Sequence, residues 1–151
     1  GLLHDIGKLL LINKIPDRML AAEEYMIQKR VDVLSAELSQ VGVTHTAVGE
    51  ALMDHWGLPQ LLIECARNHH EVVHDGPNRE ATHLIYLANC LSTYVPPLDE
   101  QETQNILDDI ENWDQGYATL EQVAFACQHA DDMVFEVMES LGMIALEINS
   151  D

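Results

Sequence analysis

The feature that most constrains this fold is the spacing of the apolar residues, which recur every three or four positions along most of the chain. In residues 79–95, for example, Leu84, Leu87, Leu91 and Val95 fall on one face of a helix. Hydrophobic residues make up 47% of the chain and aromatic residues only 5%, a composition that favours helix packing over a β-sandwich. We therefore predict an all-α fold, a helical bundle with a sizeable core.

Glycine, proline and capping residues divide this pattern into roughly seven helices. In the first half we expect a buried helix at residues 1–12 and a long amphipathic helix at residues 18–40, with one break in it left open. Thr44 is expected to cap a helix that ends at Gly57. Pro59 then opens a further helix to about residue 71, and Trp56 is expected to fill a core corner between the two.

In the second half, Pro96 and Pro97 are expected to end the helix at residues 79–95. A shorter acidic helix is expected at residues 99–113. Thr119 and Gln122 form a capping-box pattern for one final helix that reaches about residue 141. We expect a single domain over residues 1–151, in which residues 97–114 are a candidate acidic insertion. Because Gly1 already lies within an apolar pattern, we also expect that preceding residues are missing.

Charge and cysteine content narrow the classes of function. The 26 acidic and 7 basic residues give a net charge of −19, which disfavours direct binding to nucleic acid or to anionic lipid. A phosphorylated substrate would require bound cations. The three cysteines, an odd number widely spaced, do not suggest a disulfide framework, and no apolar run is long enough to cross a membrane. We expect a cytoplasmic protein.

The most informative polar residues are His4, Asp5 and Lys8, which interrupt an otherwise apolar helical pattern. Imidazole and carboxylate groups suit Zn, Fe or Mn, and Lys8, one turn from His4, could contact a metal-bound phosphate. The alternative is that His4 and Asp5 bond to backbone or to each other while Lys8 extends to solvent. Further imidazoles at His45 and at residues 69–70 favour the metal site, because such sites are often assembled from separate elements.

These segments together resemble the HDOD family, a branch of the HD superfamily of metal-dependent phosphohydrolases. The resemblance rests on Leu-His-Asp-Ile-Gly-Lys at residues 3–8, the segments at residues 45–49 and 55–59, and His-His at residues 69–70. It implies a helical bundle of the HD-domain type whose N-terminal part is missing here. It also implies that one or two metals are ringed by ligands, here the set of five His4, Asp5, His45, His69 and His70, with Lys8 as a catalytic residue.

One position departs from the family pattern. Catalytic relatives carry a late Asp ligand in a helix that resembles residues 87–89, where this chain has Asn89. An amide is neutral and a weaker metal ligand than a carboxylate. The resemblance therefore implies a regulatory signal-transduction domain of bacterial type that is catalytically degenerate and acts through signalling-protein partners.

Two alternatives stay open. The first is a metal-dependent phosphohydrolase acting on a phosphomonoester, a nucleotide or a cyclic di-nucleotide. The second is a sensor that binds a nucleotide without hydrolysing it. Cyclic di-nucleotide hydrolysis as in HD-GYP enzymes is the weaker reading, because Gly76 and Pro77 lack the tyrosine that separates them in that signature.

Overall fold

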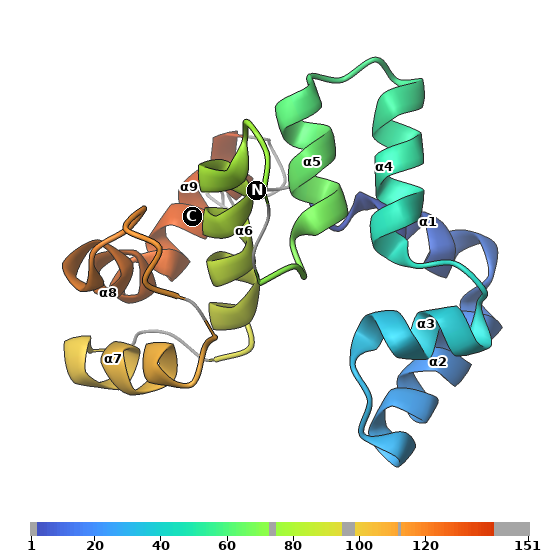
Figure 1. Ribbon diagram of the computed structural model, residues 1–151, viewed down its shortest axis with the longest axis horizontal. Coiled ribbons are helices and arrows are strands. Elements are labelled where there is room, and N and C mark those ends of the chain that lie inside the picture. Colours follow the sequence, from blue (N-terminus) through green and yellow to red (C-terminus); the bar gives the residue numbers. More distant parts are fainter. Residues whose placement is uncertain (1–2, 73–74, 95–98, 112, 141–151) are drawn as a thin grey trace, which may run out of the picture. The chain divides into compact units, whose positions relative to one another are not determined.

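The computed structural model describes residues 3–72, 75–94, 99–111 and 113–140, and every regular element among them is an α-helix (Figure 1). In chain order these are α1 (Ile6–Lys14), α2 (Pro16–Lys29), α3 (Val33–Gln40), α4 (His45–His55), α5 (Gln60–Asn68), α6 (Arg79–Leu91), α7 (Glu100–Asp108), α8 (Leu120–Gln128) and α9 (Ala130–Ser140). The prediction of an all-α fold is confirmed. Within the described ranges, each helix is too short or too polar to span a lipid bilayer.

The chain divides into two compact units, Gly1–Asn89 and Cys90–Asp151, and the boundary falls inside α6. Helices α1 to α5 belong to the first unit, and α7 to α9 to the second. The expectation of one domain over residues 1–151 stays a prediction. The stretch expected as an acidic insertion contains α7, which packs on α8 within the second unit.

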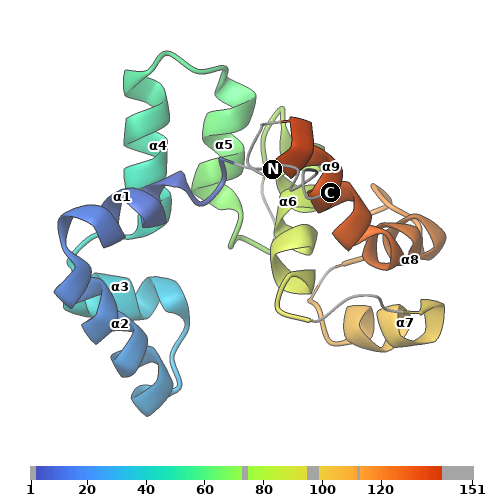
Figure 2. The ribbon, with the colours of Figure 1, turned by 180° about the vertical axis from the view of Figure 1, so that it is seen from behind.

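The first unit is built on three helix pairs, because α1 packs on α4, α4 on α5, and α2 on α3. Figures 1 and 2 show α4 and α5 side by side in both views. Met53, Ile63 and Ala66 form a buried apolar cluster between these helices, and Ile6 and Leu58 pack against it. This small core fixes the start of α1 against α4 and α5, where the functional candidates lie.

A close approach of backbones decides how α1 meets α4. A Cβ atom at Gly7 would lie 2.0 Å from the carbonyl oxygen of His45 and 2.6 Å from the amide nitrogen of Gly49. Only glycine fits such a contact without moving the backbone. Gly7 thus lets the start of α1, with His4 and Asp5 beside it, come directly against the first turn of α4.

Several predicted boundaries in this unit need correction. Arg30 takes a left-handed conformation (φ 54°) and Asp32 caps α3 by accepting from the amide of Ser35, so residues 18–40 form two helices, at the break left open in the sequence. The helix expected to reach residue 71 ends at Asn68. Thr44 does cap α4, its hydroxyl accepting from the amide of Ala47.

Two predictions of burial are wrong. The helix expected to be buried exposes Leu9 and Ile12, which are 64% and 48% exposed, because only one face of α1 contacts α4. Trp56 is 54% exposed and does not fill a core corner. Apolar spacing locates a helix, but it does not say how much of the apolar face finds a partner.

The second unit follows its local sequence signals closely. Asp99 with Glu102, and Thr119 with Gln122, form reciprocal capping boxes at the starts of α7 and α8. The predicted final helix is broken at His129, where φ is −111° and ψ is 10°, so α8 and α9 are separate. The core here is Leu107, Val123 and Cys127. The predicted stops at Pro96, Pro97 and residues 141–142 lie outside the described residues.

Candidate metal centre

Three imidazoles and one carboxylate of the first unit meet at helix ends. His45 is the first residue of α4, His69 caps the C-terminus of α5, His70 follows it, and Asp5 precedes α1. The Nε2 atom of His45 lies 3.2 Å from Nε2 of His69 and 3.1 Å from Nε2 of His70. Asp5 Oδ1 lies 3.3 Å from Nε2 of His45 and 3.4 Å from Nε2 of His69. Nε2 of His45 thus lies within 3.1–3.3 Å of one atom from each of Asp5, His69 and His70, which come from separate parts of the sequence.

Hydrogen bonds on the far side of two rings decide which nitrogen faces these atoms. The Nδ1 atom of His69 lies 2.9 Å from the carbonyl oxygen of Ala66, which can only accept, so Nδ1 is the donor. The Nδ1 atom of His45 lies 2.8 Å from both carboxylate oxygens of Glu37 and donates to them. In the neutral rings both Nε2 atoms are then lone-pair acceptors pointing at one another.

Asp5 adds a further acceptor to this group. Its Oδ1 atom is buried and has no partner of hydrogen-bond geometry. Unpaired acceptors that face each other out of water repel one another and have lost their solvation. A bound cation relieves both costs at once, and the donor set of imidazoles with one carboxylate suits divalent Zn, Fe or Mn.

The separations between these atoms also fit a metal. Ligand atoms held about 2.0–2.2 Å from one ion lie about 2.8–3.1 Å apart at neighbouring octahedral positions and about 3.3–3.6 Å apart in tetrahedral coordination. The four measured separations run from 3.1 to 3.4 Å. The first unit therefore contains a histidine cluster that could hold a metal ion, and the distances accommodate more than one kind of metal.

The protonation of the candidate ligands supports binding at neutral pH. His45 and His69 are fully buried, whereas His70 is partly exposed. Burial, followed by the electrostatic effect of the neighbouring His69, His45 and Lys8 side chains, lowers the pKa of His70 to about 4, so its ring is neutral at pH 7.

His4 and Lys8 lie on the other side of Asp5. His4 Nε2 is 3.7 Å from Asp5 Oδ2, and its ring meets that of His69 edge-on with centroids 4.8 Å apart. The ammonium of Lys8 donates to Asp5 Oδ2 at 3.3 Å. His4, Asp5 and His69 thus form a second candidate ligand group, which shares His69 with the group of His45, His69 and His70.

All five residues predicted as metal ligands, and Lys8 beside them, are therefore brought together, while coordination itself and a catalytic role of Lys8 stay predictions. Asn89 lies near the end of α6, and its replacement of a ligand also stays a prediction.

Glu37 is the residue that the sequence reading missed. It is 1% exposed, and besides the imidazole of His45 its carboxylate accepts from the backbone amide of that residue at 2.7 Å. A signal was present, because Glu37 falls three residues after Leu34 and four before Val41, on an apolar stripe. A charged residue at such a position needs a buried partner.

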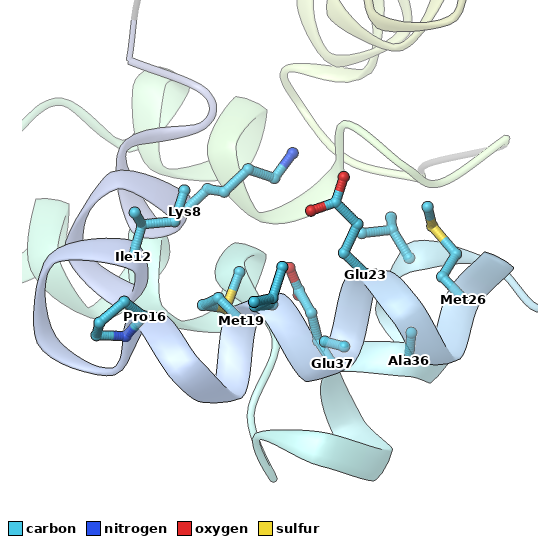
Figure 3. A pocket seen from close by; sticks show the side chains of 11 residues that line it. Lys8, Ile12, Pro16, Met19, Glu23, Met26, Ala36 and Glu37 are labelled. Atoms are coloured by element: carbon cyan, nitrogen blue, oxygen red, sulfur yellow. The ribbon is translucent and has the colours of Figure 1, made fainter. Parts of the chain in front are cut away.

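Lys8 and Glu37 also line a pocket of about 430 Å³ between α1, α2 and α3 (Figure 3). Most of its remaining lining is apolar, and Figure 3 shows the charged end of Glu23 reaching toward that of Lys8 across the opening. The volume falls within the range of small-molecule sites. The pocket therefore places a ligand-sized space next to the histidine cluster.

A helical unit with buried imidazole and carboxylate groups gathered at helix ends defines a candidate metal-binding helical domain. The family model named HDOD domain matches residues 1–72, the part of the chain whose motifs predict this resemblance. The match includes all five candidate ligands and ends just after His70.

Two further comparisons add little about function. An uncharacterized protein of Treponema pallidum (strain Nichols) is 32% identical over 76 residues, which are 49% of this chain and 14% of that protein. The chain thus spans about a seventh of the length of this relative. No solved structure matches the chain.

Proposed function

We propose that this chain is a regulatory signal-transduction domain of the HDOD family that holds one divalent metal ion, Fe, Mn or Zn, without hydrolysing a substrate. Asp5, His45, His69 and His70 would hold the ion, and His4 would stand at the edge of the site. Metal binding would fix the ends of α1, α4 and α5 relative to one another, and a partner protein would read that arrangement.

The observation that carries the proposal is the unpartnered, buried Oδ1 atom of Asp5, which faces Nε2 of His45 and of His69 at 3.3 and 3.4 Å. Hydrogen bonds from the far side of these two rings, to Glu37 and to Ala66, direct their lone pairs inward. Simple packing of polar residues would instead be expected to pair a donor with each acceptor.

The regulatory part of the proposal is supported by residue chemistry. Asn89 offers a neutral amide where catalytic relatives of the HD superfamily carry a carboxylate, which weakens charge neutralisation of the metal. The net charge of −19 also disfavours phosphorylated substrates. A protein partner, unlike a phosphorylated substrate, does not have to bring phosphate groups against this acidic chain.

Metal content and affinity test the proposal. Metal-free protein titrated separately with Zn²⁺, Mn²⁺ and Fe²⁺ should bind one equivalent of at least one of them, and the loaded protein should leave phosphomonoesters and cyclic di-nucleotides intact. Asp5→Asn should weaken the apparent affinity about 10–100-fold or more. Asp17→Asn, an acid in the first turn of α2, is the matched control and should bind like the wild type.

Failure to bind any of the three metals at millimolar concentration would contradict the metal site. Equal affinities of the Asp5→Asn variant and the wild type would contradict the ligand set. Turnover of a phosphoester would contradict the regulatory reading and favour the second candidate.

The second candidate is a metal-dependent phosphohydrolase, and the position of Lys8 favours it. The Lys8 ammonium lies 3.3 Å from Asp5 Oδ2 and also lines the neighbouring pocket, so it could neutralise a phosphate held beside the cluster. A divalent ion supplies Lewis-acid polarisation of a phosphoryl group when bound. Lys8→Ala should then abolish hydrolysis and leave metal content unchanged, whereas Lys14→Ala at the end of α1 should change neither hydrolysis nor metal content.

A nucleotide sensor remains a prediction of the sequence. The pocket beside Lys8 has the volume for part of such a ligand. Calorimetry with cyclic di-nucleotides tests this, and the absence of heat at millimolar ligand would contradict it.

A further inference from the structure

We propose that Glu37 is a positioning residue that holds the proton of the His45 imidazole on Nδ1 and so presents Nε2 to the metal. This inference rests on the proposed metal site. It adds a residue that touches no metal and that the sequence pattern assigned to no function.

Both carboxylate oxygens of Glu37 accept hydrogen bonds from His45. Both carboxylate oxygens lie 2.8 Å from Nδ1 of His45, and Oε2 also accepts from the His45 backbone amide at 2.7 Å. Glu37 and His45 are 1% and 0% exposed, so no water competes for these bonds. A buried carboxylate is costly unless such donors satisfy it, which makes the pair depend on each other.

The backbone between α3 and α4 brings Glu37 next to His45. The amides of Val41 and Gly42 both donate to the carbonyl oxygen of Glu37, at 2.7 and 3.0 Å, and so close α3. Gly42 takes a positive φ of 90°, which turns the chain toward Thr44, the cap of α4. The side chain of Glu37 therefore meets the first residue of the next helix eight positions later.

The consequence for His45 is chemical as well as geometric. A carboxylate beside Nδ1 accepts its proton, so the opposite nitrogen keeps its lone pair, as a metal ligand must. Such a carboxylate also fixes the orientation of the ring. His69 achieves the same orientation with the neutral carbonyl of Ala66, so His45 is the ring that a charged group tunes.

Glu37→Gln isolates this role, because the side chain keeps its shape. If the amide oxygen accepts from the His45 backbone, the amide NH₂ faces Nδ1 and donates to it. The His45 proton then moves to Nε2, the atom that must face the metal. The affinity of the metal-free protein for Zn²⁺ or Mn²⁺, measured by chelator competition, should fall about 10–100-fold.

A helix-capping role is the rival explanation, and Asp32→Ala serves as its control. Asp32 caps the same helix, α3, by accepting from Ser35, and it has no part in the cluster. If Glu37 only stabilises the helix connection, Asp32→Ala and Glu37→Gln should change metal affinity alike. We expect Asp32→Ala to lower stability and leave affinity unchanged.

The tautomer of His45 gives a readout that does not need metal. Long-range ¹H–¹⁵N spectra of the metal-free wild type should show His45 with its proton on Nδ1, and Glu37→Gln should show it on Nε2. A wild-type proton on Nε2, or equal affinity in the Glu37→Gln variant, would overturn the role of Glu37. A wild type that binds no metal but shows the Nδ1 tautomer would contradict the proposed function and support the Glu37 arrangement.

Discussion

The two units of this chain use polar side chains in different ways. In the second unit, the capping bonds of Asp99 with Glu102, and of Thr119 with Gln122, join residues three apart. In the first unit, buried Glu37 bonds to His45 eight positions away, and His45 lies against His69, 24 positions further along the chain. Local bonds define where helices begin, whereas long-range ones bring chemical groups together.

The burial of polar residues follows the same division. In the second unit the buried polar residue Thr103 donates its hydroxyl to the carbonyl oxygen of Asp99, near the start of its own helix. In the first unit the buried Asp5 Oδ1 atom lacks such a partner. Among the described residues, the buried side-chain atom without a hydrogen-bond partner thus lies in the first unit, beside the histidine cluster.

The largest expected effect concerns the contact that holds α1 on α4. Gly7→Ala places a Cβ atom 2.0 Å from the His45 carbonyl oxygen, and we expect a loss of about 3 kcal/mol or more in the free energy of unfolding. Gly49→Ala is the control, since its nearest contacts would be 3.5–3.8 Å, and it should be neutral or stabilising by up to about 1 kcal/mol. Urea unfolding of both variants measures this, and equal losses would contradict the close-approach argument.

The next largest effect is stabilisation by bound metal, which we expect in the first unit only. Metal at 100 times its dissociation constant should stabilise the native state by about 2.7 kcal/mol. Hydrogen exchange should show this protection at α4 and α5 but not at α8. His69→Ala should abolish it, because His69 belongs to both candidate ligand groups, while His129→Ala in the second unit should not. Equal protection of α8 would show that the units unfold together.

A smaller effect is expected from pH in the metal-free protein. The pKa of His70 is lowered from 6.5 to about 4, so between these values the unfolded chain binds more protons than the folded one. Stability should therefore be full above pH 6.5 and fall as pH is lowered, by about 1 kcal/mol at pH 5 after allowance for the partial exposure of the ring. His70→Gln should flatten the unfolding free energy between pH 7 and 5, and an unchanged slope would contradict this origin.

The smallest effects compare two helix caps. Thr44→Ala and Thr119→Ala each remove a hydroxyl that accepts from an amide three residues later, and each should cost about 1 kcal/mol of stability. Only Thr44→Ala should also weaken metal binding, because the next residue is His45. If Thr119→Ala weakens binding as much, the site depends on the second unit.

Much of the fold could be predicted from sequence because its signals are local. Thr44, Thr119 and Gln122 cap helices where the pattern places them, since a cap needs only its own first turn. The sequence-based prediction leaves the break at Arg30 open and misses the break at His129. In both places the apolar spacing continues although the helical backbone conformation ends. The backbone angles that end a helix cannot be read from the spacing of apolar residues.

By itself the sequence determined the helical class, the caps Thr44 and Thr119, and the histidines and aspartate that carry the family resemblance, because these follow from residue type and short spacing. Only the tertiary structure decided that Glu37 is the partner of His45, that Gly7 must lack a side chain, and that Asp5 Oδ1 faces two lone pairs. The physical reason is that burial and hydrogen bonding between distant residues depend on how helices pack, and side-chain spacing along one helix does not encode its neighbour.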